Sequence, residues 1–140
     1  VEQPVAGWDR AGLAEVRRAT GLPIMADESL HTVRDAVELI ERGAVDLFAI
    51  KLIKTGGLAQ ARVIAALAAA HRIDVVVVSP YETQIGTAAG LALALAAPTA
   101  TRAQELGVFY EESRGVRIEE GFLYPSQAPG LGVEAAPALR

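Results

Sequence analysis

Five polar residues stand at regular intervals along the chain, each at the end of an expected strand. The intervals are 25, 24, 28 and 26 residues, and the five are Glu2, Asp27, Lys51, Ser79 and Glu105. Glu2 and Asp27 offer hard carboxylate oxygens, which suit Mg²⁺, a cation that commonly takes only a few protein carboxylates. A lysine beside such a cation has its ammonium form disfavoured by like charge and by burial, so Lys51 could accept a proton. The set predicts proton abstraction next to a carboxylate, with the metal stabilising the enolate.

The stretch around Lys51 predicts how such residues are positioned. An apolar run over 47–51 ends at the lysine, two glycines follow at 56 and 57, and an alanine-rich helical pattern begins at Leu58. Strand alternation puts Phe48 and Ile50 on one face and Lys51 on the other. If the bulkier face meets helices, Lys51 points inward at the carboxyl end of its strand.

The same strand-to-helix unit repeats along the chain. We expect strands over 22–26, 47–51, 73–79 and 104–106, with helices over 9–21, 32–43, 58–72 and 84–97. Repeated units with right-handed crossovers form a parallel sheet, either open or part of a β/α barrel. A barrel has about eight such units, so roughly half of one is present. From Gly107 onward the pattern is lost, and the prediction is a partial barrel at 1–106 and a C-terminal segment at 107–140 that packs on the barrel or on a capping domain.

The composition favours a folded domain and argues against nucleic acid or a membrane as a partner. The chain has 140 residues, of which 51% are apolar, so a folded domain with a real core is expected. The formal charge of −4 gives no basic surface for nucleic acid or an anionic membrane. The sequence has no cysteine, which is compatible with a cytoplasmic protein, and no apolar run is long enough to cross a bilayer.

Three motifs and a closing segment identify a family resemblance that covers essentially the whole chain. They are Glu2-Gln-Pro4, Ala26-Asp-Glu-Ser29, Ile50-Lys-Leu-Ile-Lys-Thr-Gly-Gly57 and Pro129-Gly-Leu-Gly-Val133. Together they resemble the enolase superfamily, specifically the C-terminal domain of the muconate-lactonizing enzyme and mandelate racemase family in its muconate-lactonizing branch. Enolase-superfamily sites are a standard example of a lysine base paired with Mg²⁺. The resemblance implies an α/β fold, the C-terminal part of a TIM-type barrel.

The resemblance also implies roles for the polar residues that end the first strands. Glu2 and Asp27 would be magnesium ligands, and Lys51 would be the acid/base catalyst. Lys54 is expected to be peripheral. The first metal-binding aspartate of the family and its second base would lie before Val1. We therefore expect the chain to be a fragment that is inactive in isolation.

The substrate end of the site follows from the same resemblance. Ser79 and Tyr81 would contact a small-molecule carboxylate substrate, and Glu105 would lie at the rim of the last strand. No histidine ends the 73–79 strand, so the mandelate-racemase branch fits poorly, and the sequence at 103–105 makes dipeptide epimerisation less favoured. Cycloisomerisation, racemisation or epimerisation and o-succinylbenzoate synthesis remain open, and a homo-oligomer is expected.

Two other readings compete with this enzyme. One is a non-catalytic half-barrel, an interaction or structural module that pairs with another half. The other is an unrelated β/α barrel enzyme that holds phosphate with Gly56 and Gly57 at a helix N-terminus. His31 and His71 end no strand and are expected on the surface.

Overall fold

Three parallel strands form the central sheet of the computed structural model, which describes residues 1–107 and 116–133. They are adjacent in the order β1 (Met25–Ala26), β2 (Leu47–Ile50) and β3 (Asp74–Val77). Single parallel bridges extend the sheet on both sides, from Glu2 to Met25 and from Val78 to Glu105. Five chain segments therefore run side by side in parallel, as the repeat predicts.

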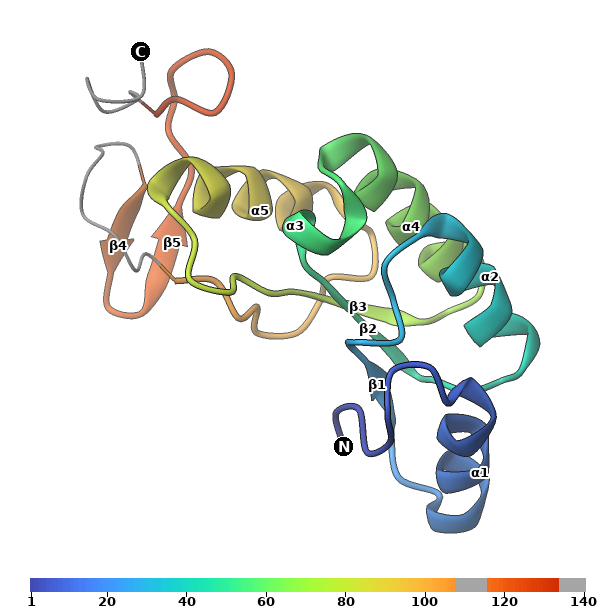
Figure 1. The fold of residues 1–140 in the computed structure, drawn as a ribbon. Coiled ribbons are helices and arrows are strands. Elements are labelled where there is room, and N and C mark those ends of the chain that lie inside the picture. Colours follow the sequence, from blue (N-terminus) through green and yellow to red (C-terminus); the bar gives the residue numbers. More distant parts are fainter. Residues whose placement is uncertain (108–115, 134–140) are drawn as a thin grey trace.

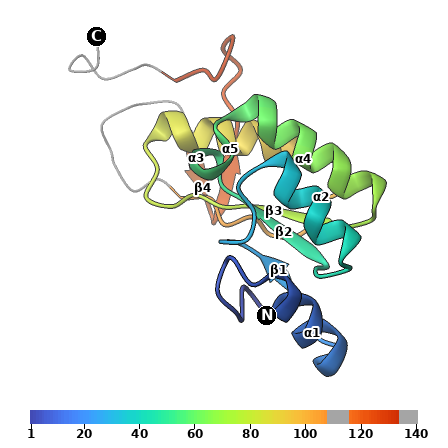
Figure 2. The same ribbon diagram turned by 45° about the vertical axis from the view of Figure 1, so that its right-hand side comes forward.

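Helices connect these strands and cover one face of the sheet. Figures 1 and 2 show α2, α4 and α5 on the same side of β1, β2 and β3. The helices are α1 (Arg10–Thr20), α2 (Val33–Glu41), the one-turn α3 (Leu52–Thr55), α4 (Leu58–Ala70) and α5 (Gln84–Ala96). The described part of the chain contains no helix with the length and apolar character that a membrane span requires.

The core lies between the sheet and these helices. Phe48 and Ile50 are fully buried and belong to the main hydrophobic cluster, together with Ile64 of α4. Ala49 is also fully buried but lies outside that cluster, because alternate strand residues face opposite sides. This confirms that the bulky face of β2 meets the helices and leaves the face of Ala49 and Lys51 for the site.

Side-chain caps set the helix starts that the sequence predicts. The Asp9 carboxylate accepts the backbone N–H of Gly12 at the start of α1. Thr32 and Asp35 form the expected capping box at the start of α2, and Thr83 caps α5. The helix boundaries agree with the predicted ones to within a few residues.

The first strand is shorter than predicted. Only Met25 and Ala26 form β1, whereas a strand over 22–26 was expected. Pro23 has no N–H, and the N–H of Ile24 donates to the Asp46 carboxylate at 2.9 Å instead of to a strand. A hydrogen bond to the Asp46 side chain therefore stands where the first main-chain hydrogen bond of the strand was expected.

The C-terminal part contains a hairpin that the sequence did not reveal. Strands β4 (Arg117–Glu119) and β5 (Phe122–Tyr124) pair antiparallel through a turn in which Glu120 and Gly121 have φ of 49° and 83°. Positive φ at both turn residues matches the twist of hairpin strands. Residues 108–115 and 134–140 of the expected 107–140 segment lie outside the described residues.

Candidate active site

Asp27 and Lys51 meet at the carboxyl ends of β1 and β2. The Nζ atom of Lys51 lies 2.5 Å from Oδ2 of Asp27, and the two side chains are 19% and 7% exposed. Lys51 directly follows β2 and is the N-cap residue of α3. The carboxyl ends of parallel strands are where β/α proteins place their chemistry.

Lys54 is the second amine at Asp27. Its Nζ donates to the Asp27 carboxylate, to the Asp27 main-chain carbonyl at 2.6 Å and, at 3.4 Å, to the carbonyl of Ala49. The single turn of α3 returns residue 54 to the side of residue 51, because positions three apart on a helix are neighbours. The expectation that Lys54 is peripheral is wrong, and the unpredicted helix α3 explains why.

Burial and charge act in opposite directions on this cluster. Burial alone would raise the pKa of Asp27, but hydrogen bonds from Lys51 and Lys54 and their positive charges hold that pKa below its usual value. Burial lowers the pKa of Lys54, with a further contribution from the like charge of Lys51, although Asp27 opposes both. The buried carboxylate is thus ionised and bound by two amines.

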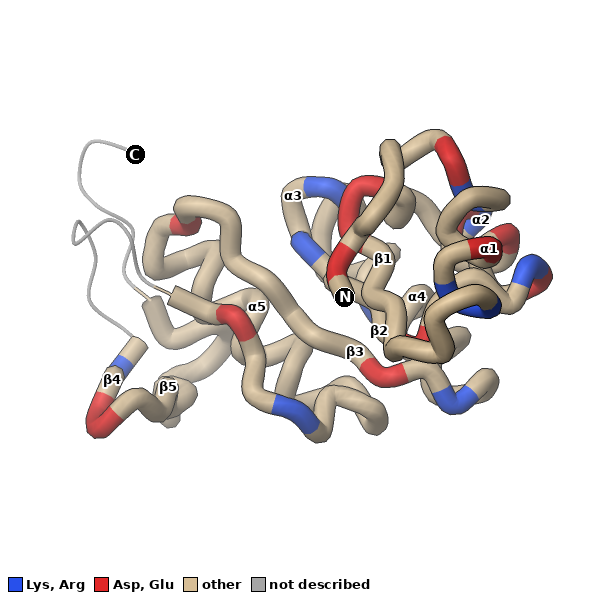
Figure 3. The backbone as a smooth tube through the Cα atoms, turned by 90° about the horizontal axis from the view of Figure 1, so that it is seen from below, with Lys and Arg blue, Asp and Glu red and all other residues tan. Residues whose placement is uncertain are grey.

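Glu2 is exposed on the segment beside β1, and the charges of Asp27 and Lys51 act on its carboxyl group. Burial raises the pKa of Glu2, and the negative charges of Asp27 and Glu105 raise it further, whereas Lys51 lowers it. Figure 3 shows the acidic segments near the N-terminus beside the basic segments around α3. A cation near Glu2 and Asp27 would relieve the repulsion between these carboxylates.

The predicted substrate residues lie farther along the same rim. Ser79 is buried, and its N–H donates to the carbonyl of Glu105 at 2.9 Å, so the structure brings these two together. Tyr81 is 77% exposed and has a φ of 48°, which turns the chain out of β3 toward α5. Glu82 follows in this loop, and burial raises the pKa of its carboxyl, a feature that its residue type alone does not reveal. His31 and His71 are exposed, as expected.

The donor set fits a hard cation in part. Glu2 and Asp27 supply carboxylate oxygens of the kind that Mg²⁺ prefers. No group of three acidic, histidine or cysteine residues with metal-binding geometry occurs within residues 1–107 and 116–133. Two carboxylates are compatible with magnesium, since this ion commonly retains waters and substrate oxygens as further ligands.

Comparison with known proteins gives a consistent result. The model of the enolase C-terminal domain-like family matches residues 1–139. Muconate cycloisomerase 1 of Rhodococcus opacus is 40% identical over 139 residues, which cover 96% of this chain and 37% of the relative. The chain therefore spans little more than a third of the length of such relatives.

Solved structures agree with the sequence match. The L-Ala-D/L-Glu epimerase of Bacillus subtilis superposes with a TM-score of 0.90 and 36% identity over 95% of this chain and 38% of that chain. The dipeptide epimerase of Enterococcus faecalis, solved with Mg and the dipeptide L-Leu-L-Tyr, superposes with a TM-score of 0.88 and 36% identity over 96% of this chain and 40% of that chain.

These matches exclude an unrelated barrel enzyme and make the parallel sheet the C-terminal part of a TIM-type β/α barrel. The chain belongs to the enolase C-terminal domain-like family, as a relative of the muconate cycloisomerases.

Proposed function

We propose that the complete protein carrying this chain is a Mg²⁺-dependent enzyme that abstracts a proton alpha to the carboxylate of a small molecule. The observation that carries the proposal is the 2.5 Å contact between Lys51 Nζ and the Asp27 carboxylate at the ends of adjacent parallel strands. It brings the Lys51 amine, which we propose as the base, directly beside a carboxylate that could hold the metal. Relatives named for muconate and for dipeptides, one solved with Mg, support a carboxylate substrate and this metal.

Each residue in the cluster has a distinct task in this proposal. Glu2 and Asp27 would hold the ion, and bound magnesium supplies positive charge that stabilises the negative charge developing on the substrate carboxylate. Lys51 exchanges its contact with Asp27 for one with the substrate. As the neutral amine it takes the proton from the alpha carbon and becomes the ammonium, which can return that proton. Racemisation or epimerisation, cycloisomerisation and o-succinylbenzoate-type elimination share this step.

The loops at the rim would bind the rest of the substrate. Ser79 and Glu105 are already joined by a main-chain hydrogen bond, and Tyr81 extends from the same loop. We assign these three residues to substrate binding, in a protein that functions as a homo-oligomer.

The base is tested by Lys51→Ala in the complete protein. Turnover of muconate or of L-Ala-L-Glu, and exchange of the alpha proton in D₂O, should fall by about 10²–10⁴-fold, the usual contribution of a general base. Magnesium binding, measured by calorimetry, should survive because Asp27 and Glu2 remain. Retained proton exchange would remove Lys51 from the mechanism.

The metal ligand is tested by Glu2→Gln. The amide keeps the size of the side chain but loses its charge, so a higher magnesium concentration should be needed for half-maximal activity. Glu15→Gln, an exposed position on α1, is the matched control and should leave that concentration unchanged. An unchanged magnesium dependence in Glu2→Gln would contradict the ligand assignment.

A non-catalytic half-barrel module is the alternative. It is favoured by the finding that no group of three candidate metal ligands occurs within the described residues. Failure of the complete protein to bind magnesium, together with dimerisation that depends on concentration, would support it. The intact mass of the natural protein is also informative, because a mass well above 14.7 kDa leaves room for a further ligand and a second base.

A further inference from the structure

The hydrogen-bond ladder beside β1 contains a rung made by a side chain. Two rungs are regular: the N–H of Met25 donates to the carbonyl of Val1 and the N–H of Gln3 donates to the carbonyl of Met25, both at 2.9 Å. In a parallel ladder the N–H of Asp27 would next donate to the main-chain carbonyl of Gln3. It donates instead to the side-chain oxygen Oε1 of Gln3, at 3.0 Å.

The backbone of Gln3 explains the exchange. Its φ is 33°, in the left-handed region that residues other than glycine rarely adopt, so the chain turns away from β1 toward Pro4. The Gln3 side chain remains beside β1, and its oxygen accepts the hydrogen bond that the main-chain carbonyl would otherwise accept. Such a conformation persists only where surrounding contacts hold it.

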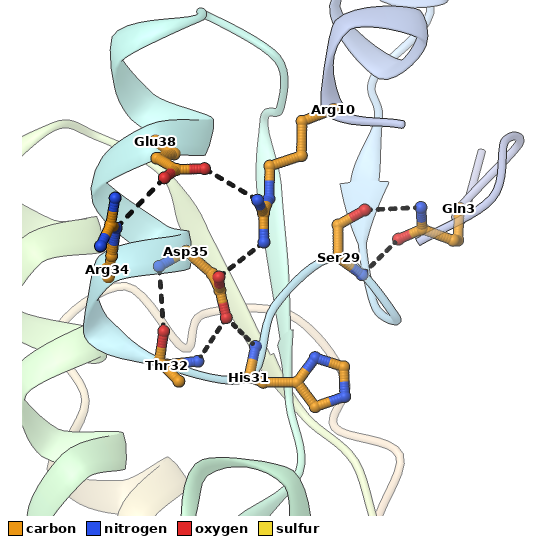
Figure 4. Close-up of polar contacts among 8 residues, drawn as sticks. All are labelled: Gln3, Arg10, Ser29, His31, Thr32, Arg34, Asp35 and Glu38. Carbon is orange, nitrogen blue, oxygen red and sulfur yellow. Dashed lines mark hydrogen bonds and ion pairs between the residues drawn. The ribbon is translucent and has the colours of Figure 1, made fainter. Parts of the chain in front are cut away.

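The Gln3 amide is fully engaged in this position. Its oxygen also accepts the N–H of Ser29 at 3.1 Å, and its nitrogen donates to Ser29 Oγ at 2.8 Å and to the carbonyl of Val5 at 3.1 Å. Figure 4 shows the paired contact between the Gln3 side chain and Ser29. Ser29 is only 1% exposed, so a loss of these bonds would leave buried polar groups without partners.

We propose that Gln3 is a positioning residue that fixes the carboxylates of Glu2 and Asp27 relative to one another. It is covalently next to Glu2 and hydrogen-bonded to the main chain of Asp27 and, two residues on, of Ser29. The inference rests on the proposed function, in which these two carboxylates hold magnesium. Mutation of groups that orient metal ligands typically weakens metal affinity by about 10–100-fold.

The opposite edge of the sheet offers a matched control. There the N–H of Val77 donates to Oε1 of Gln104 at 2.7 Å, and Gln104 Nε2 donates to the carbonyl of Arg102 at 2.7 Å. Gln104 therefore also replaces a main-chain rung, but it binds Val77, the last residue of β3, and these two hydrogen bonds involve neither candidate metal ligand. The two glutamines share their chemistry and differ in their distance from the site.

The experiment compares Gln3→Met and Gln104→Met in the complete protein. Calorimetric titration with Mg²⁺ should show about 10–100-fold weaker binding in Gln3→Met and an unchanged affinity in Gln104→Met. Hydrogen exchange in the magnesium-free protein gives a second readout. The amides of Asp27 and Ser29 should exchange faster in Gln3→Met only, and the amide of Val77 faster in Gln104→Met only.

The outcomes separate this inference from the proposed function. A parent that binds magnesium and a Gln3→Met variant with the same affinity would overturn the positioning role and leave the metal site intact. Equal losses of affinity in both variants would also overturn it, because they indicate general destabilisation. A parent that binds no magnesium would overturn the proposed function, and this inference with it.

If Gln3→Met does not fold, Ser29→Ala provides a milder test. It removes only the bond from Gln3 Nε2 to Ser29 Oγ and leaves the rung to Asp27 in place. A few-fold weaker magnesium affinity supports the positioning role, and an unchanged affinity contradicts it.

Discussion

Lys54 connects two strand ends through a single amine. Its Nζ binds the carbonyl and the carboxylate of Asp27 on one strand and reaches the carbonyl of Ala49 on the next, with a side chain only 13% exposed. Lys54→Met keeps much of the apolar stem but removes these hydrogen bonds. The free energy of unfolding of the complete protein should fall by about 1.5–3 kcal/mol, as for hydrogen bonds to charged groups, measured by urea denaturation.

Lys54→Arg is the comparison for this prediction. It keeps a positive charge and several donors, so it should lose less stability than Lys54→Met, although the fork of the guanidinium does not reproduce the ammonium geometry. Equal stability of the parent and Lys54→Met would mean that these contacts contribute nothing net.

Single residues differ in how well the sequence predicts them. Strand alternation predicts the side of the sheet on which the Lys51 side chain lies, and the contact between Lys51 and Asp27 agrees with their regular spacing. The position of Lys54 depends on α3, a single turn that no periodic pattern in the sequence announces. The role of Gln3 depends on a positive φ that only the packed structure reveals.

An ion-pair network joins the two helices nearest the N-terminus. Arg10 of α1 donates to Asp35 at 2.5 Å and to Glu38 at 2.8 Å, both on α2, and Asp35 also accepts the N–H groups of His31 and Thr32 (Figure 4). Burial would raise the pKa of Asp35, but the Thr32 and His31 hydrogen bonds and the Arg10 charge lower it overall.

Asp35→Asn should therefore destabilise the complete protein in a manner that depends on pH. Because the pKa is lower in the folded state, the carboxylate contributes stability above its ordinary pKa of 3.8 and loses that contribution as pH falls through the folded-state pKa. We expect a loss of about 1–3 kcal/mol in the free energy of unfolding at pH 7. The difference from the parent should shrink below about pH 4, measured by denaturation over a pH series.

Arg34→Ala is the control for this network. Arg34 pairs with Glu38 at 3.4 Å through a side chain that is 87% exposed, so its removal should change stability very little. A difference between Asp35→Asn and the parent that stays constant into acid would contradict the assigned role of the carboxylate charge.

At the level of elements, the sequence predicts helices better than strands here. Helices α1, α2, α4 and α5 carry caps or apolar patterns that can be read locally. Strand β1 is cut short by Pro23 and by a long-range bond from Ile24 to Asp46, which no local pattern shows. The hairpin of β4 and β5 depends on a Glu-Gly turn and on strands of three residues, too short for clear alternation.

At the scale of the whole molecule, the central sheet formed by the described residues has two open edges. As described, the sheet ends at Glu2 on one side and at Glu105 on the other, and Phe122 of the hairpin is 67% exposed. Unpaired strand edges and exposed apolar groups favour association. We expect the isolated 140-residue chain to form oligomers or aggregates whose size increases with concentration, as measured by sedimentation velocity.

The complete protein is the reference for that measurement. Its assembly should be of defined size and independent of concentration over the same range, because the edges are then covered within each subunit. A monomeric, cooperatively melting 140-residue chain would show that the half-barrel closes its own edges and would favour the structural-module alternative.

The direct passage from β2 into α3 has a consequence for the motion of Lys51. The strand ladder anchors its N-terminal side, where the N–H of Val78 binds the carbonyl of Ile50, and its own carbonyl accepts the N–H groups of Lys54 and Thr55. With the main chain fixed on both sides, the Lys51 Nζ atom can travel from Asp27 to a substrate only by rotation about the four bonds of its stem. Because the Lys51 side chain is only 19% exposed and paired with Asp27, its delivery to the substrate requires that this ion pair opens but requires no movement of the main chain.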